Sequence, residues 1–590
     1  MSCYMILGML TLRAESDASQ TLAALFKRIG SPPVDRDSAL DQIQTFGSRL
    51  AIMAIPDMPY SRPRISIIPF SDGQLIVLAD VYIGERGSQP EKTDTLSPEL
   101  PLSWSLPGRW IAISVPHDTN KPIQWASDPI GAQWLYFAET SDGVVFSDSF
   151  RIVAKAADRG QNIDPEALCR ALVLGYNLEQ ETIIPSVKLA PGGCVYEWGT
   201  GDFHSVRSHQ LEYGDALAGA TDAEKVAQVE AAFHEAALSW KKVLPTRTAL
   251  SLSAGLDSRT ALAYLRRVGV EMSFHTFGQP GSTEVIGAQA VAQHISCNTR
   301  LFEIPTASWG DWAMNIQRLG GVGPVQQSGW AQRWRAMLAN EADAVVIGYL
   351  GDALTGKHLS SRQLDRSDWI NYWTHWSLSW EWQEWPGLRK KWRKGLFNNL
   401  AANFRQATNT LEVAFPHQKA FHLDLYCRQR RWVASQPNDI GAVLLPVCFF
   451  YHPAIWKIWA NLPLHDLERQ ALYRRANHQL FPELFHRPVS PAEDMFQRAL
   501  WKLARFLKRA DVGLPPSERP RVIDRWQALE VTRQRIIDQL EHSREPLEQV
   551  VDVDFVLERM DTFGLQRPSE AECAMIMRVV NASHLISATI

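Results

Sequence analysis

A short loop in the middle of the chain is built from the smallest side chains and is followed by an acid and a hydroxyl. In the stretch TALSLSAGLDSRTALAYL, residues 248–265, an apolar strand runs into a Ser-Ala-Gly loop, and a helix begins around Asp257 and Ser258. A strand that feeds a helix through small residues exposes backbone N–H groups at the positive end of the helix dipole, which is a common way to hold phosphate. The alternative is a structural turn in which the Asp and Ser side chains only cap the helix.

The order Ser-x-Gly-x-Asp-Ser resembles the phosphate loop of the ATP pyrophosphatases, which hold the β,γ-pyrophosphate and cleave ATP at the α-phosphate. The loop lacks the Gly-Lys-Ser/Thr of a Walker A sequence. The resemblance implies that Asp257 helps to hold Mg²⁺, a hard cation that takes oxygen ligands, and that Ser253 and Ser258 donate hydrogen bonds to phosphate oxygens of ATP. The loop residues expected to contact the nucleotide are Ser251, Ser253, Ala254, Gly255, Asp257 and Ser258.

Two later segments extend the resemblance to the asparagine synthetase family. FHTFGQPGSTEVIGAQAVAQHI, residues 274–295, and VVIGYLGDALTG, residues 345–356, follow the loop in the order and spacing of that family's later motifs. The resemblance makes Asp352 a second magnesium ligand at the end of a neighbouring parallel strand, where ligands of open α/β sheets bind. A simple turn residue is the alternative. The nucleotide-binding set then also includes Phe277, Gly278 and Gly351.

The same resemblance assigns two further positions to the chemistry. Tyr349 stands where asparagine synthetases have Glu and β-lactam synthetases have a catalytic Tyr, so it is expected to orient an amine or relay its proton. A packed tyrosine at a strand end is the alternative. The family's late lysine has no counterpart at the matching place, where Arg487 is the closest cation and joins the expected catalytic residues. Residues 449–463 resemble one of the family's last helices, with His452 where the family has Asp.

The N-terminal part resembles the glutaminase domain of the same family but lacks its catalytic residues. Residues 108–153 contain SDPIGAQWLY where that domain has Arg-Asp-x-x-Gly-x-x-Pro-Leu-Tyr. Such a glutaminase needs Cys directly after the initiator Met, because the free α-amine acts as the base for the thiol. Here Ser2 holds that place, Cys3 is expected to be a small core residue, and LADVYIGERG, residues 78–87, replaces the Asn-Gly of the oxyanion site. The domain is therefore expected to be catalytically silent.

These motifs need a scaffold, which the apolar pattern of the chain predicts. Up to about residue 205, short β-branched segments separated by turn signals indicate antiparallel sheets. A helix with Thr221 as its N-cap opens a second region, where strands alternate with helices as in a parallel sheet with crossover helices. Beyond residue 360 the pattern is almost entirely helical. The alternating elements are a helix, a strand, a helix and a strand at residues 221–244, 271–278, 283–295 and 342–352.

The pattern and the resemblance together give the expected fold class, an α/β protein. Residues 1–210 are expected to form a degenerate, glutaminase-like (Ntn-type) antiparallel β-sandwich domain. Residues 211–590 are expected to form a PP-loop ATP pyrophosphatase α/β domain with a largely helical C-terminal extension.

Composition excludes several classes of function. With 45% hydrophobic and 21% charged residues the chain has the composition of an ordinary globular protein. A net charge of -4 provides no overall attraction to nucleic acid or to an anionic membrane. Seven scattered cysteines without a CxxC pair indicate neither a disulfide framework nor a zinc site, and a cytoplasmic location fits them best. The opening MSCYMILGMLTLR predicts a core strand, and neither a signal peptide nor membrane insertion is expected.

The expected function combines an ATP pyrophosphatase site with a silent glutaminase-like domain. Without ammonia from glutamine, the nucleophile must be an amine already on the substrate, as in β-lactam synthetases and in the cyclases of lasso peptides. A tryptophan-rich segment at 369–385 favours the peptide branch, unless that helix face is interior packing. The resemblance thus implies an ATP- and Mg²⁺-dependent lasso peptide cyclase. Such an enzyme adenylylates an Asp or Glu side chain of a leader-free core peptide and joins it to the N-terminal amine as a macrolactam, releasing AMP and pyrophosphate.

The same resemblance implies a core peptide as substrate, with a leader peptidase and a leader-recognition protein as partners. The basic run RKKWRK, residues 389–394, is either a solvated helix face or a contact for an acidic leader peptide. Two other functions stay open. One is an asparagine synthetase-like or β-lactam synthetase-like ligase acting on a small amino acid, and the other is a nucleotide-binding scaffold without turnover.

Overall fold

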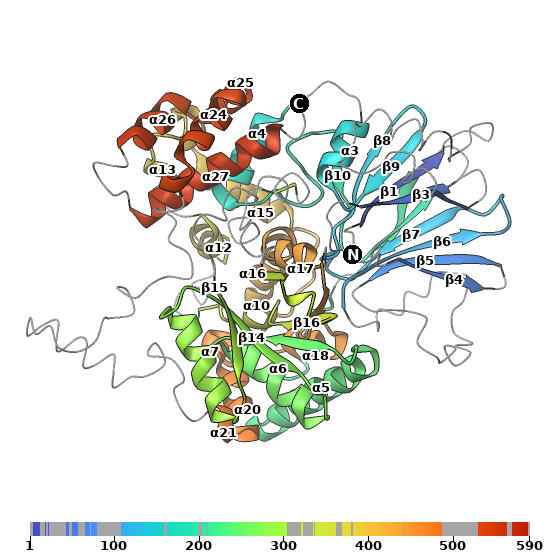
Figure 1. Ribbon diagram of the computed structural model, residues 1–590, viewed down its shortest axis with the longest axis vertical. Coiled ribbons are helices and arrows are strands. Elements are labelled where there is room, and N and C mark those ends of the chain that lie inside the picture. Colours follow the sequence, from blue (N-terminus) through green and yellow to red (C-terminus); the bar gives the residue numbers. More distant parts are fainter. Residues whose placement is uncertain are drawn as a thin grey trace, which may run out of the picture.

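The N-terminal part of the chain forms two six-stranded antiparallel sheets (Figure 1). The computed structural model describes residues 4–11, 18, 20, 22, 43–46, 50–56, 65–70, 72–79, 108–157, 162–198, 203–208, 211–303, 320–321, 334–335, 337–360, 369–378, 381–441, 443–485, 529–562 and 569–587. The first sheet, in the order β10-β8-β9-β1-β3-β2, consists of Lys188–Leu189, Tyr136–Glu139, Gly143–Ser147, Tyr4–Thr11, Leu50–Pro56 and Ile43–Phe46. The second, in the order β12-β11-β7-β6-β5-β4, consists of Phe203–Ser208, Cys194–Trp198, Ile123–Ser127, Trp110–Pro116, Gly73–Ala79 and Ile65–Phe70.

The two sheets share one apolar core. Side chains alternate along each strand, so Ile52 and Phe146 of the first sheet and Ile76 and Ile113 of the second are buried in the same cluster. Trp125 lies among them, in edge-to-face contact with Phe146 at 5.8 Å between ring centroids. The antiparallel sheets predicted for the first 205 residues are thus confirmed.

The middle of the chain contains a five-stranded sheet in which all neighbours are parallel, in the order β15-β14-β13-β16-β17. Its strands β13 to β17 are Thr248–Ser251, Ser273–Gly278, Thr299–Glu303, Ala344–Ile347 and Leu445–Cys448. From β13 the chain adds β14 and β15 on one side and then β16 and β17 on the other, so the winding reverses between β13 and β16. Ligands of open α/β sheets bind at such a switch point, outside the carboxyl ends of the strands.

Three long helices accompany this sheet, α5 (Asp222–Val243), α6 (Leu256–Arg267) and α7 (Thr283–His294). Thr221 caps α5 as predicted. Its hydroxyl accepts a hydrogen bond from the backbone N–H of Glu224, and the Glu224 carboxylate accepts one from the backbone N–H of Thr221, which completes a capping box. The alternation of helix and strand predicted for this region is confirmed.

Two elements differ from the prediction. The strand expected at 342–352 is only β16, because the chain turns after Ile347 through Leu350, whose φ of 73° ends the strand, into the short helix α10 (Gly351–Leu354). The second is β17 (Leu445–Cys448), which lies in the region expected to be helical. Pairing with buried β16 decides its conformation, since a four-residue apolar run has no periodicity of its own.

Beyond β16 the described chain is otherwise mainly helical, as predicted. The longer helices are α12 (Trp369–Ser377), α15 (Leu396–Gln406), α16 (His417–Leu423), the π-helix η3 (Asp424–Val433), α17 (Ser435–Ile440), α18 (Pro453–Trp459), α20 (Ala471–Leu480), α24 (Arg533–His542), α26 (Val553–Thr562) and α27 (Glu570–Ser587). Helices α18 and α20 pack against α5, and α27 packs against α4 (Pro165–Leu174) of the N-terminal part. Trp373 of α12 is fully buried, so this face of the tryptophan-rich segment is interior packing.

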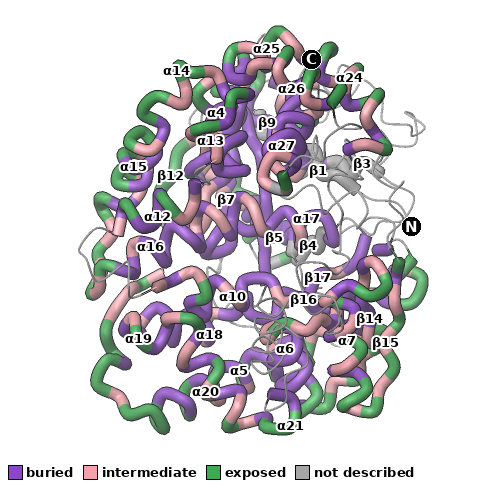
Figure 2. The backbone as a smooth tube through the Cα atoms, turned by 90° about the vertical axis from the view of Figure 1, so that its left-hand side faces the viewer, coloured by how far each residue is buried: buried purple, intermediate pink, exposed green. Residues whose placement is uncertain are grey.

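Burial follows this arrangement. Buried residues run through the strands and the inner helices, while the outer turns are exposed (Figure 2). The basic run forms α14 (Lys390–Arg393), which has no buried residue and is a solvated surface segment. In the part of the chain that the structure describes, each helix is too short or too polar to cross a lipid bilayer.

Asp128, in the segment SDPIGAQWLY, connects the sandwich to the end of the parallel sheet. Its buried carboxylate accepts hydrogen bonds from the backbone N–H groups of Gly131 at 2.6 Å, Ala132 at 3.0 Å and Gln133 at 2.9 Å. The hydroxyl of Tyr451, which follows β17, donates to the same carboxylate. This acid therefore fixes the turn and holds the two parts of the protein together.

Candidate active site

The carboxyl ends of β13 and β16 lie side by side, because Leu250 of one strand pairs with Val346 of the other. Beyond β13 the chain passes through the small loop into α6, and beyond β16 it turns into α10. The loop and the Gly-Tyr-Leu-Gly turn therefore meet at the switch point of the sheet. Asp257 and Asp352 are 95 residues apart in the sequence, and the pairing of β13 with β16 brings their two motifs together.

A cavity of about 300 Å³ opens at this point. Eight of the residues predicted from the sequence line it: Ser251, Ser253, Gly255, Asp257, Ser258, Phe277, Tyr349 and Asp352. The other lining residues were not predicted: Leu252, Thr276, Glu284, Ile347, Gly348, Leu350, Val433 and Gln436. Ala254, Gly278 and Gly351 are neighbours of lining residues without lining the cavity themselves. Arg487, Ser2 and Cys3 lie outside the described residues.

Hydroxyl groups hold the small loop in shape. The Ser253 and Ser258 hydroxyls are 3.0 Å apart, the Gly255 N–H donates to the Ser253 hydroxyl at 3.1 Å, and the Ser258 hydroxyl donates to the Ser253 carbonyl at 3.1 Å. The N-cap of α6 is Gly255, and within the described residues no side chain caps this helix. Asp257 and Ser258 are therefore not caps, and the N-terminus of a 12-residue helix faces the cavity.

The charge of Asp352 affects the second carboxylate at the cavity, Asp257. Burial, and then the nearby charge of Asp352, raise the pKa of Asp257 from 3.8 to about 7, although Lys357 and a hydrogen bond from Tyr473 act in the opposite direction. The Tyr473 hydroxyl donates to Asp257 Oδ1 at 3.1 Å, and Lys357 Nζ lies 3.2 Å from Asp352 Oδ2. Two acids that repel each other beside a helix N-terminus form an arrangement that a divalent cation relieves.

Two glycines allow the close approach of these acids. A Cβ atom on Gly351 would lie 2.5 Å from Asp257 Cγ, and one on Gly348 would lie 2.9 Å from Asp257 Cβ. A side chain at either position would displace Asp257. The Gly-x-x-Gly turn thus serves the packing of the Asp257 carboxylate against the end of β16.

Tyr349 is buried, and its ring stacks on that of Tyr451 with 6.2 Å between centroids. Its hydroxyl donates a hydrogen bond of 3.1 Å to the backbone carbonyl of Gln429 in η3. Burial raises the pKa of Tyr349 well above its ordinary value, so the side chain remains a phenol at neutral pH. It can donate a hydrogen bond or orient a group, but it cannot act as a phenolate base.

His358 borders the site through its contact with Asp352. His358 Nε2 lies 3.8 Å from Asp352 Oδ2, and His358 Nδ1 lies 2.6 Å from Asp424 Oδ2. Burial by itself would raise the pKa of Asp424, but His358, Arg428 and hydrogen bonds outweigh it and hold this pKa below its ordinary value. The ring of the half-buried Trp376 in α12 lies 4.6 Å from that of His358.

Several residues at or beside this site were not predicted from the sequence. Lys357 follows Asp352 by five residues and was detectable as the nearest cation to that acid, but Val433 and Gln436 come from the end of η3 and the start of α17, far along the chain. Glu284, in the first turn of α7, belongs to a segment that was recognised without assigning this residue a role. Among the described residues no group of three or more His, Cys, Asp or Glu side chains is arranged to hold a metal ion.

Comparison with known proteins adds no assignment: no protein-family model matches the chain, and no curated protein matches it.

Proposed function

We propose that the protein is an ATP-dependent, AMP-forming carbon–nitrogen ligase whose second part is a PP-loop ATP pyrophosphatase domain. The observation that carries this proposal is the convergence of eight residues, chosen from the sequence as nucleotide, metal or catalytic residues, on one cavity at the switch point of a parallel sheet. A ligand at this place is typical of open α/β sheets.

The residues of the cavity fit a nucleotide triphosphate. The uncapped start of α6 and the Ser253 and Ser258 hydroxyls offer hydrogen bonds to phosphate oxygens. Asp257 and Asp352 would hold Mg²⁺, which neutralises charge on the leaving pyrophosphate when it is bound. Lys357 Nζ, 3.2 Å from Asp352 Oδ2, supplies a positive charge beside that acid. Thr276 and Phe277 form an uncharged part of the cavity wall, which suits the nucleoside of ATP.

Among ligases of this kind we propose a lasso peptide cyclase. The N-terminal sandwich suits a degenerate glutaminase-like domain, in which Asp128 has a structural task and no ammonia is made. The nucleophile is then an amine of the substrate itself. The substrate carboxylate attacks the α-phosphorus of ATP and pyrophosphate leaves; the N-terminal amine next attacks the activated carbonyl, AMP leaves, and the amine loses a proton.

The proposal is tested with ATP, Mg²⁺ and synthetic peptides that have a free N-terminus and a single Asp or Glu at successive positions. If the side-chain carboxylate is labelled with ¹⁸O, one labelled oxygen must appear in AMP, and a product lighter by one water must form. Label in inorganic phosphate with release of ADP would contradict AMP formation. Product only from free aspartate and ammonium would support the asparagine synthetase-like alternative, and nucleotide binding without any pyrophosphate release would support the scaffold.

A further inference from the structure

The end of η3 forms part of the wall of the candidate site, and this π-helix is attached to the N-terminal part. Val433, its last residue, lines the cavity, and the carbonyl of Gln429 accepts the Tyr349 hydroxyl. The same carbonyl also accepts the N–H of Ala434 at 2.8 Å, in the i to i+5 pattern of a π-helix. Wide helical turns of this kind are rare and occur frequently at functional sites.

Arg430 and Arg431, directly after Gln429, reach across to the sandwich. Arg430 donates to the carbonyls of Glu179 at 2.8 Å, Gly131 at 3.3 Å and Ala190. Arg431 donates to the Glu179 carbonyl at 2.9 Å, and it also donates to the Glu181 carbonyl. Both arginines are buried, with 2% and 6% exposure. Charged donors on fixed carbonyls make strong, directional bonds in such surroundings.

The backbone of η3 is held from the sandwich as well. The indole N–H of Trp134 donates to the carbonyl of Arg430 at 2.7 Å. Asn438, in the helix that follows, donates to the carbonyl of Ala132 at 2.8 Å. Side chains and backbone of the same few residues are thus bonded to one surface of the N-terminal part.

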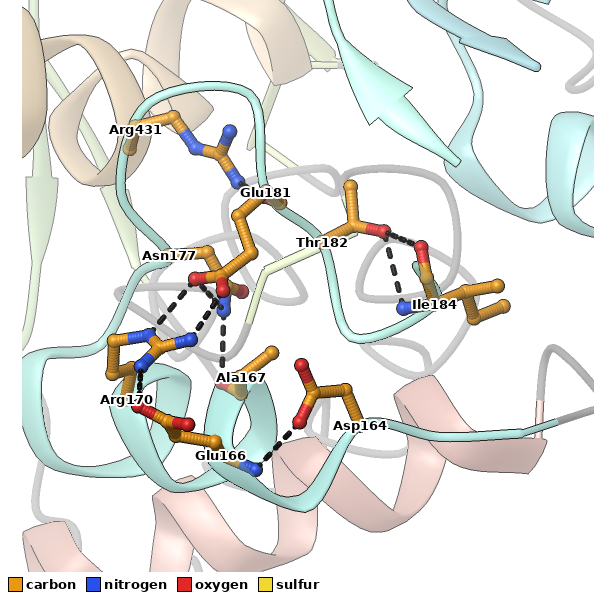
Figure 3. A network of polar contacts seen from close by, with 9 residues as sticks. All are labelled: Asp164, Glu166, Ala167, Arg170, Asn177, Glu181, Thr182, Ile184 and Arg431. Atoms are coloured by element: carbon orange, nitrogen blue, oxygen red, sulfur yellow. Dashed lines mark hydrogen bonds and ion pairs between the residues drawn. The ribbon is translucent and has the colours of Figure 1, made fainter. Parts of the chain in front are cut away.

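The receiving loop is itself fixed (Figure 3). Two of its residues are bonded to helix α4. The Glu181 carboxylate accepts a hydrogen bond from Arg170 Nε at 2.9 Å, and the Asn177 amide donates one to the carbonyl of Ala167 at 2.8 Å. Figure 3 shows Arg431 approaching the loop beside Glu181, while Arg170 holds that carboxylate from α4. Glu179, which presents its carbonyl to both arginines of η3, has a left-handed φ of 46°. A non-glycine residue keeps this conformation only where its surroundings impose it.

From these contacts we infer that Arg430 and Arg431 are positioning residues, through which the N-terminal domain holds η3 and with it Tyr349 and Val433 in place for the reaction. This inference rests on the proposed function. The sandwich then contributes to catalysis as a rigid frame and needs no catalytic group of its own. The loop expected to hold phosphate lies between β13 and α6 and makes none of these contacts. Loss of Arg430 or Arg431 should therefore affect the reaction of the substrate beside Tyr349 and Val433 and leave the affinity for nucleotide unchanged.

The test compares full-length Arg430→Met, Arg431→Met and Trp134→Phe proteins with wild type. We expect kcat for pyrophosphate release to fall about tenfold in the arginine variants and about threefold in Trp134→Phe, with KM for ATP changed less than about twofold. Hydrogen exchange of the amides in 424–433 should become faster in all three. Lys225→Met is the control, since it breaks the buried Lys225–Asp466 pair, which belongs neither to the cavity lining nor to the contacts of η3 described above, and it should lower Tm without altering kcat per folded molecule.

Unchanged kcat and unchanged exchange in Trp134→Phe, or an equal fall of kcat in Lys225→Met, would overturn the inference. Trp134→Phe keeps both guanidinium groups and decides the matter if an arginine variant does not fold. If wild type itself releases no pyrophosphate, the proposed function fails. The exchange of 424–433 still reports in that case whether the sandwich holds η3.

Discussion

Asp257→Asn should stabilise the nucleotide-free protein above neutral pH and at the same time abolish its response to nucleotide. Burial and the charge of Asp352 raise the pKa of Asp257 from 3.8 to about 7. The folded protein therefore binds this proton more tightly than the unfolded chain does, and stability falls as pH rises from about 4 to about 7. Asparagine keeps an oxygen that accepts the Tyr473 hydrogen bond but never ionises, so the variant does not lose this stability.

The size of the effect follows from the shift. A difference of about three pKa units corresponds to about 4 kcal/mol once the group is fully ionised, and about 2 kcal/mol of it develops between about pH 5.5 and about pH 8. Asp257 borders the cavity, and water there screens part of the repulsion, so about 1 kcal/mol is expected in that interval. The advantage of Asp257→Asn in Tm should therefore grow by about 1 °C between these pH values.

The assay is thermal unfolding of wild type and Asp257→Asn at a series of pH values, with and without ATP and Mg²⁺. Without nucleotide the difference in Tm should increase with pH. With nucleotide, wild type should be stabilised and the variant should not, because one of two cation ligands is gone. A difference in Tm that is constant with pH, or a variant that is less stable than wild type at about pH 8, would refute the electrostatic reasoning. A full nucleotide response in the variant would refute the metal assignment.

Four further outcomes are expected. Gly351→Ala should greatly reduce pyrophosphate release with the fold retained, because its Cβ would lie 2.5 Å from Asp257 Cγ, whereas Gly219→Ala, which meets no described atom within 4 Å, should behave as wild type in the same assay. Lys357→Met should lower kcat and move the acid limb of the pH–rate profile to higher pH, since Lys357 lowers the pKa of Asp257; an unmoved limb would exclude this charge from the site. Tyr349→Phe should lose one buried hydrogen bond, about 1 kcal/mol by chemical denaturation, and should lower kcat for pyrophosphate release because it breaks the contact between η3 and Tyr349. Thr221→Ala should cost about 1 kcal/mol through the lost capping box of α5 and leave activity unchanged.

Local pattern was sufficient for much of the fold. Thr221 with Glu224 marks the start of α5, and the alternation of apolar strands with helices between residues 222 and 347 leads directly to a parallel sheet. It also brings Asp257 and Asp352 to the same edge, since the carboxyl ends of neighbouring parallel strands meet there. The position in the fold of a residue that directly follows a strand could therefore be predicted from the sequence.

Contacts made across the chain could not be predicted in this way. Strand β17 is recognisable only by its pairing with β16. The π-helical turns of η3 have no sequence signature, and Arg430 and Arg431 look like an ordinary basic surface pair until the loop at Glu179 and Glu181 is seen to receive them. Long-range partners, and not local propensity, decide these features.

The packing of α7 on the phosphate loop leaves room for a single methyl group. A Cβ built on Gly287 would lie 2.2 Å from the Cβ of Ala254. The loop has alanine at 254, where the ATP pyrophosphatases that it resembles have glycine. Helix α7 therefore needs glycine at position 287, which faces this alanine. The two positions form a complementary pair: a chain with glycine at 254 has space for alanine at 287, and an alanine at both would push the helix away from the loop. Related sequences should accordingly exchange these two residues together rather than one at a time.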